Sequence, residues 1–400
     1  GPVLVTETDP YGKLLAVHLT VRDRAALDQR FGQPGALNLV HRMLTTGVAG
    51  CDEACLARRL GEIGAEIKLV DDPRFPMDDY YTNGRFSFIR LECPAEHAGA
   101  ALELLAELVQ FSSFTEEDLA RERRAQLSLL GRRAGSASAI SRQLLRDGLY
   151  GDHPLAAPAE GTVASVSAIT YDDLRSLYRE AFHAENLIVS IVSPLGHDEV
   201  ADLLTGLPTN GGGREPMAPL PLTTTPERIT ETLGGPLGVI RVGSVREIDP
   251  ADRPALELLV AILSDRLQMD LRETRGLGYS VGAGIAIHGD RAVFTASVNP
   301  PTARVPEGEE ALAAALRTFD ATTITQDELD TARSARQGRL TMRRLDSISR
   351  AYYLAMSDLA TGGTARYERQ IDAYDAVTLA DLQGVSSFFS ELPLVTVVVD

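Results

Sequence analysis

The sequence is poor in residues that would mark several common protein classes. It has no tryptophan, only three cysteines in 400 residues, and no apolar run long enough to cross a bilayer. The apolar runs 187–192 and 394–399 have the length of single strands, so membrane insertion is not expected. The chain starts with Gly1-Pro2 instead of methionine, like the remnant of a cleaved tag, which leaves open that a signal peptide was removed.

The cysteines give little support for a disulfide framework or a metal site. Cys51, Cys55 and Cys93 are sparse and odd in number, which suits a reducing compartment, and we therefore expect a cytoplasmic location. Cys51 and Cys55 could share one face of a helix, but no further Cys or His follows at zinc-ligand spacing. We expect these thiols to pack rather than to bind metal.

The charge balance argues against nucleic-acid binding. The formal net charge is −17, whereas nucleic-acid binding needs a positive footprint. Arginines do gather between residues 121 and 133, but acidic residues of 116–122 are interleaved with them. This mixture is typical of a solvated helix face.

A repeated pair of helix starts indicates that the chain is duplicated. Thr115 with an acid three residues later recurs at Thr325, 210 positions on (325 − 115). Thr170 with an acid three residues later recurs at Thr378, 208 positions on (378 − 170). Such a threonine caps the free amides at a helix start. Two matches in the same order at nearly the same offset favour duplication over coincidence.

The duplication predicts two α+β domains. Residues 1–207 form the first, 227–400 the second, and the Gly- and Pro-rich segment 208–226 is the linker. Strand patterns such as 14–21 and 85–91 come in neighbouring pairs, and helical patterns such as 95–109 come in runs. This order favours α+β domains over a doubly wound sheet.

One hydrolase motif is present in the wrong context. Gly278-x-Ser280-x-Gly282 spells a nucleophile elbow, which requires a strand before the serine and a helix after it. Here a helical pattern ends at Arg275 and a strand pattern follows Val281, so we do not expect a serine nucleophile. The seven histidines also include no pair at metal-binding helical spacing.

The segment 37–47 resembles the first-domain helix of the M16 metallopeptidases, the mitochondrial-processing-peptidase and pitrilysin family. That helix carries His-x-x-Glu-His, then Met-Leu, two residues and Gly. The match on Met43-Leu44 and Gly47 places Asn38 at the first zinc ligand, His41 at the general base and Arg42 at the second ligand. All three roles are lost.

The resemblance also places the third zinc ligand. In the family this ligand is a glutamate seven residues after another acid, and Glu122 matches the earlier acid. Leu129 stands seven residues after Glu122, and a leucine side chain cannot bind a metal. The resemblance therefore implies that this chain binds no zinc.

The second half keeps the family's other motif. Residues 271–280, Leu-Arg-Glu-Thr-Arg-Gly-Leu-Gly-Tyr-Ser, resemble the stretch whose Arg and Tyr hold the substrate backbone at the zinc site of the other half or subunit. Arg272 and Tyr279 take these positions, and their donors suit a carbonyl that becomes negative. The structural alternative is that Arg272 interacts with a helix C-terminus and Tyr279 anchors the next strand.

Together these features predict a zinc-free, non-catalytic subunit of the LuxS/MPP-like metallohydrolase fold. The resemblance implies a homologous partner with intact His-x-x-Glu-His, zinc on that partner, and a peptide or precursor peptide as substrate. Arg272 and Tyr279 would be donated to the partner's site. A structural scaffold subunit and a stand-alone peptide-binding protein of the same fold are the alternatives.

Overall fold

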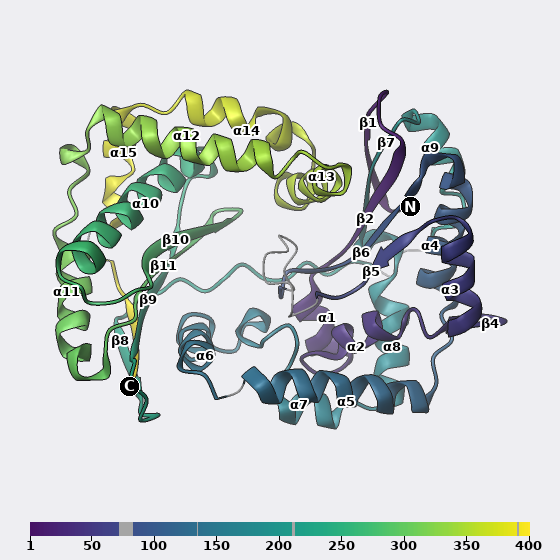
Figure 1. Ribbon diagram of the computed structural model, residues 1–400, viewed down its shortest axis with the longest axis horizontal. Coiled ribbons are helices and arrows are strands. Elements are labelled where there is room, and N and C mark those ends of the chain that lie inside the picture. The colour runs from purple at the N-terminus through teal and green to yellow at the C-terminus, as the bar shows by residue number, and fades with distance from the viewer. Residues whose placement is uncertain (72–82, 134, 210–212, 390–391) are drawn as a thin grey trace. The chain divides into compact units, whose positions relative to one another are not determined.

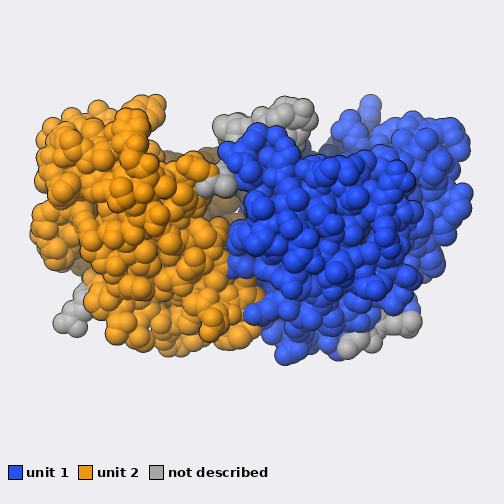
Figure 2. All heavy atoms as spheres, turned by 90° about the horizontal axis from the view of Figure 1, so that it is seen from below, with its two compact units in different colours: residues 1–132, 157–217, 343–367 blue, residues 133–156, 218–342, 368–400 orange. Residues whose placement is uncertain are grey.

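The computed structural model describes residues 1–71, 83–133, 135–209, 213–389 and 392–400. It divides into two compact units, and neither is a single stretch of chain (Figure 2). Unit 1 comprises residues 1–132, 157–217 and 343–367, and unit 2 comprises residues 133–156, 218–342 and 368–400. The predicted ranges 1–207 and 227–400 follow the order of the two sequence halves, whereas the compact units interleave these halves.

Unit 1 contains a five-stranded sheet in the order β1-β7-β2-β6-β5 (Figure 1). β1 runs parallel to β7, and the remaining neighbours are antiparallel. The strands are β1 (Val3–Thr8), β2 (Leu14–Arg22), β5 (Glu66–Lys68), β6 (Phe86–Pro94) and β7 (Leu187–Ser193), and a separate hairpin pairs β3 (Gly47–Val48) with β4 (Cys51–Asp52). The predicted strand pair 14–21 and 85–91 is confirmed as β2 and β6.

Helices cover both faces of this sheet. Leu19 of β2 and Ile191 of β7 point into the larger core with α2, α4 and α8, whereas Ile188 of β7 faces Leu354 of α13. A strand buried on both faces must be apolar on both, which explains the continuous run at 187–192. The helices of unit 1 are α1 (Arg24–Phe31), α2 (Ala36–Met43), α3 (Glu53–Glu62), η1 (Ala95–His97), α4 (Ala98–Phe111), α5 (Glu116–Arg133), α7 (Val163–Ala168), α8 (Tyr171–Ala181), η3 (Ala184–Asn186), α9 (His197–Leu203) and α13 (Ser347–Thr361).

Unit 2 repeats the connectivity of unit 1. Its sheet has the order β10-β11-β9-β12-β8, with β8 parallel to β12 and the other neighbours antiparallel. In both sheets, the first strand of the half lies beside the last, and the last lies beside the second. The strands are β8 (Glu227–Glu231), β9 (Val239–Glu247), β10 (Val281–His288), β11 (Arg291–Val298) and β12 (Val395–Val399). The predicted fold, two duplicated α+β domains with mostly antiparallel sheets, is confirmed.

The two sequence halves exchange equivalent helices. α6 (Ala137–Tyr150) belongs to the first half and α13 (Ser347–Thr361) to the second, and their starts are again 210 positions apart (347 − 137). α6 packs on β9 and β12 of unit 2, and α13 packs on β2 and β7 of unit 1. The other helices of unit 2 are η2 (Pro154–Ala156), η4 (Pro250–Asp252), α10 (Arg253–Leu267), η5 (Gln268–Thr274), η6 (Thr302–Arg304), α11 (Val305–Arg317), η7 (Ala321–Thr323), α12 (Gln326–Met342), α15 (Leu379–Gly384) and η8 (Ser386–Phe389), and α14 (Ala365–Asp375) spans the division at residue 367.

The four predicted threonine caps are all present. Each threonine hydroxyl accepts a hydrogen bond from the backbone N–H three residues later, at the start of α5, α8, α12 or α15. Each acidic side chain in turn accepts a hydrogen bond from the N–H of the threonine, so the free N–H groups of both residues are satisfied. The caps that indicated duplication therefore occupy equivalent places in the two halves.

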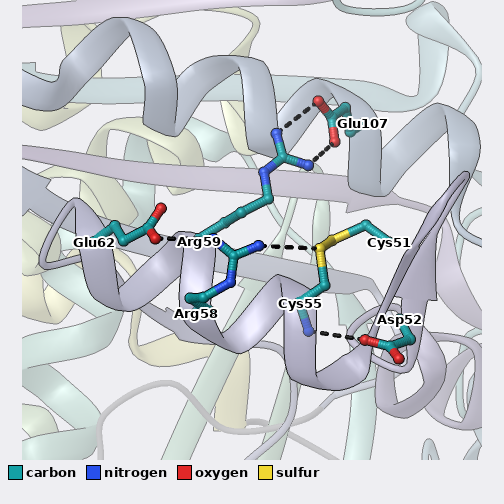
Figure 3. The surroundings of a disulfide bond; sticks show 7 residues. All are labelled: Cys51, Asp52, Cys55, Arg58, Arg59, Glu62 and Glu107. Atoms are coloured by element: carbon teal, nitrogen blue, oxygen red, sulfur yellow. Dashed lines mark hydrogen bonds and ion pairs between the residues drawn. A yellow bond between two sulfur atoms is a disulfide. The ribbon is translucent and has the colours of Figure 1, made fainter.

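The expectation that the cysteines are unpaired is wrong for two of them. Cys51 and Cys55 form a disulfide, with Sγ atoms 2.03 Å and Cα atoms 5.3 Å apart (Figure 3). The reason is local: Cys51 belongs to β4 and Cys55 lies in the first turn of α3, and this junction brings their Cα atoms within disulfide range. Cys93 is a buried free thiol, and burial raises its pKa to about 11. Cysteine usage therefore no longer indicates a reducing compartment.

Candidate functional site

In unit 1, a buried carboxylate fixes the helix that the resemblance assigned to zinc. Asp28 of α1 accepts hydrogen bonds from the N–H groups of Gly35 (3.1 Å) and Leu37 (2.7 Å) at the start of α2. These donors would otherwise be unsatisfied at the helix terminus. Burial raises the pKa of Asp28 to about 6, against the opposing effect of Arg24. With α2 held at its start, Asn38 and His41 both lie inside unit 1, 4% and 1% exposed.

Asn38, at the first ligand position, belongs to an amide network. Its Nδ2 donates to Oε1 of Gln126 on α5 at 3.0 Å, and its Oδ1 accepts from Nη2 of Arg24 at 3.3 Å. Gln126 Nε2 in turn donates to the carbonyl oxygens of Glu160 (2.7 Å) and Gly35 (3.3 Å). The carboxamide of Asn38 is therefore committed to protein partners on both of its ends.

His41, at the general-base position, is a buried neutral imidazole. Its Nε2 lies 2.8 Å from Oγ of Ser87 on β6. Burial, with a further contribution from the positive charge of Arg24, lowers the pKa of His41 to about 3. This side chain has neither the carboxylate nor the solvent access that the family's catalytic glutamate needs.

The three remaining positions do not complete a metal site. Arg42 is a half-buried cation, and Leu129 of α5 is a half-buried apolar side chain. Glu122 accepts a hydrogen bond from Nε of its neighbour Arg121 at 3.1 Å. Within the described residues, no group of three or more His, Cys, Asp or Glu could hold a metal ion. Zinc needs several N, S or O donors, so these residues do not fit it.

Sequence reasoning missed two members of this site. Gln126 stands one helical turn before Leu129, so a search of the inner face of α5 could have found it. Arg24 is the first residue of α1 and belongs to no motif. Only the fold brings it to Asn38.

In unit 2, Arg272 and Tyr279 lie together. Arg272 belongs to η5, and its Cζ lies 4.7 Å from the centre of the Tyr279 ring, a cation–π contact. Nε of Arg272 lies 3.1 Å from a carboxylate oxygen of Glu273. Tyr279 is 84% exposed, so its ring and hydroxyl face solvent rather than the core of unit 2. The proposal that Tyr279 anchors the next strand through burial is therefore not supported.

The backbone between Arg272 and Tyr279 is fixed, although the side chains are exposed. Leu277 is fully buried, and its N–H donates to the carbonyl of Leu271 at 2.7 Å. Gly276 has φ +57, and its carbonyl accepts from Nη1 of Arg304 at 2.9 Å. Gly278 approaches Asn299 so closely that a Cβ atom would lie 2.6 Å from the Asn299 carbonyl oxygen. Arg272, on η5, and Tyr279, five residues after its end, thus project from backbone that is held by hydrogen bonds and close packing, as a binding pair requires.

The serine within this motif has the context expected from the sequence. Ser280 is followed directly by β10, not by a helix. The carbonyl of Ser280 accepts from the N–H of Asn299 at 3.2 Å. The strand–serine–helix order of a nucleophile elbow is therefore absent at this position.

Comparisons with known proteins found M16 peptidases and proteins named zinc proteases. Residues 168–336 match the family model described as the peptidase M16 inactive domain, a range that includes Arg272 and Tyr279 but not α2. The sequence is 26% identical over 303 residues to an uncharacterised zinc protease of Mycobacterium leprae, covering 72% of this chain and 67% of that protein.

Solved structures share the fold. A peptidase M16 inactive domain from Pseudomonas fluorescens has a TM-score of 0.84 at 20% identity, covering 100% of this chain and 95% of that chain. The periplasmic protease PqqL from Escherichia coli has a TM-score of 0.79 at 15% identity, covering 98% of this chain and 43% of that chain.

Proposed function

The chain belongs to the M16 peptidase family, and we propose that it acts there as a zinc-free, non-catalytic subunit of a metallopeptidase pair. Its substrate is a peptide, hydrolysed at the zinc site of a homologous partner with intact His-x-x-Glu-His. This chain supplies Arg272 and Tyr279 to that site.

The exposed Arg272–Tyr279 pair is the observation that carries the proposal. A purely structural role would be expected to bury Tyr279, but Tyr279 is 84% exposed beneath the guanidinium of Arg272. The guanidinium presents several N–H donors in a fixed fork, and the tyrosine presents one O–H donor. Both suit a peptide carbonyl, and both stabilise it further as its oxygen becomes negative.

The loss of zinc ligands in unit 1 supports a pair in which the partner binds zinc and this chain supplies Arg272 and Tyr279. Asn38 and His41 are buried and hydrogen-bonded, and Leu129 offers no donor atom. A chain without its own metal can contribute to hydrolysis only through another chain. This reasoning commits the proposal to a partner.

We would first isolate the tagged chain from its native cell extract, identify the co-purifying proteins by mass spectrometry and quantify zinc in the same sample. The proposal expects a similar-sized chain with intact His-x-x-Glu-His and about one zinc per pair. A chain that purifies alone and zinc-free would remove the donor role of Arg272 and Tyr279.

In that pair, Arg272→Ala should lower kcat/KM for peptide cleavage roughly 100-fold, the scale of losing one donor to a developing oxyanion. Tyr279→Phe keeps the ring over Arg272 but removes the hydroxyl, and it should also lower kcat/KM. Assembly, measured by size-exclusion chromatography, should be unchanged in both variants because these side chains are exposed.

Arg275→Ala is the matched control. Arg275 lies three residues from Arg272, is similarly exposed and pairs with Asp270 at 2.9 Å. This variant should retain wild-type cleavage. If Arg272→Ala cleaves as fast as the wild type, the donor role fails and the scaffold alternative takes its place.

A further inference from the structure

Arg24 is a buried cation at the degenerate zinc site. It is 3% exposed, and the negative charges of Asp28, Glu160 and Asp71 offset part of the cost of burying its positive charge. Its Nη2 donates to Oδ1 of Asn38 at 3.3 Å and to the carbonyl of Ala159 at 2.7 Å, while its Nε has no hydrogen-bond partner. A charged group is seldom buried in this way without a specific role.

We propose that the guanidinium of Arg24 replaces a metal ion in this site. It links segments of unit 1 that a metal would otherwise link, and it prevents a divalent metal from binding beside residue 38. The inference rests on the loss of zinc ligands in unit 1 and is independent of the roles of Arg272 and Tyr279.

The cross-linking role follows from the hydrogen bonds. Arg24 at the start of α1 joins Asn38 of α2 to the 159–160 segment, and Gln126 of α5 joins the same two places. A metal held by ligands on α2 and α5 would connect the same two helices. The side chains of Arg24, Asn38 and Gln126 are each at least 96% buried, so their hydrogen bonds have no competition from water.

The blocking role follows from distance and charge. A metal ion bound by a side chain at residue 38 would lie about 2.0–2.2 Å from its donor atom. The same donor region is 3.3 Å from Nη2 of Arg24, so ion and guanidinium would stand within roughly 5.5 Å of each other. Two positive charges at this separation repel strongly when little water screens them.

The test compares two variants of the full chain. Both restore the family's ligands with Asn38→His, His41→Glu, Arg42→His and Leu129→Glu, and one of them also carries Arg24→Ser. We would measure zinc content after dialysis, affinity by competition with a chromophoric chelator, and the visible absorption of bound cobalt. The Arg24→Ser version should bind zinc at least tenfold more tightly. Equal affinity of the two versions would overturn the blocking role.

A second measurement applies even if the restored chains do not fold. In the otherwise unchanged protein, Arg24→Met should lower Tm clearly, and Arg24→Lys should lower it less because the charge remains. Arg30→Met is the control, since Arg30 lies on the same helix but is partly exposed and pairs with Glu215 at the surface. If Arg24→Met and Arg30→Met have the same Tm, the cross-linking role is overturned.

Discussion

At the scale of single residues, exposure separates the two parts of the candidate site. Asn38, His41 and Gln126 are buried and hydrogen-bonded, as structural residues are. Tyr279 is exposed and its backbone is fixed, as a binding residue is. The resemblance implies which zinc-site residues the first half has replaced. Only burial shows what the replacements do.

Buried histidine makes the protein sensitive to acid. His18 of β2 lies against Phe88 and Tyr352, with Nδ1 3.0 Å from Oγ1 of Thr20. Burial, with a contribution from the charge of Arg90, lowers its pKa from 6.5 to about 3. The folded state therefore favours the neutral ring. This contribution to stability is complete above pH 6.5 and is lost as the pH falls from 6.5 towards 3.

We therefore expect the free energy of unfolding to decrease between pH 6.5 and pH 3, with His18 contributing on the order of a few kcal/mol. Urea unfolding at a series of pH values measures this slope. His18→Gln should make it shallower, with the lowered pKa of His41 maintaining part of it, whereas His97→Gln, at a partly exposed residue, should keep the wild-type slope. The same slope in all three proteins would refute the assignment to His18.

At the scale of elements, local signals were reliable where a few adjacent residues decide the structure. The threonine caps gave the starts of α5, α8, α12 and α15 because the capping hydrogen bonds join residues three apart. The disulfide is also local, but the sequence did not reveal it. A helix over Cys51 and Cys55 and a strand-to-helix junction have the same spacing, and only the second brings the sulfur atoms together.

The disulfide leads us to propose an oxidising compartment in place of a cytoplasmic one. In protein taken from native cells and denatured without reductant, an alkylating reagent should modify Cys93 only. After reduction it should modify all three cysteines, as intact-mass spectrometry would show. Alkylation of all three cysteines without reductant would instead indicate a reducing compartment.

No helix in the described part of the chain could span a membrane.

At the scale of the whole molecule, the exchanged helices tie the two sequence halves together. α13 covers Val5, Ile188 and Val192 on the sheet of unit 1. α6 brings Leu145 and Leu149 against the sheet of unit 2. Each sequence half thus lacks the helix that buries one face of its own sheet, and an uncovered apolar sheet face favours aggregation.

We therefore expect the separate fragments 1–207 and 227–400 to bind a hydrophobic dye and to lack a cooperative thermal transition. A full chain cut at an engineered protease site within 208–226 should stay associated and keep its Tm, because it retains α6 and α13. Size-exclusion chromatography and calorimetry distinguish these results. A cooperative, dye-free fragment 1–207 would contradict the exchange.

The sequence by itself determined the features that depend on neighbouring residues or on a repeated order. These are the caps, the strand periods, the duplication, and the residue types at Asn38, His41, Arg42 and Leu129, which the resemblance aligns with a zinc site. Each follows from residue types at fixed short spacings, which the chain carries with it.

Only the tertiary structure decided which distant residues meet. Arg24 reaches Asn38, Gln126 reaches the 159–160 segment, and α6 and α13 join sheets of the opposite sequence halves. The physical reason is that a buried donor or an apolar face needs a partner, but many segments of the chain could supply one. Packing of the whole chain selects among them, and no short spacing in the sequence records that choice.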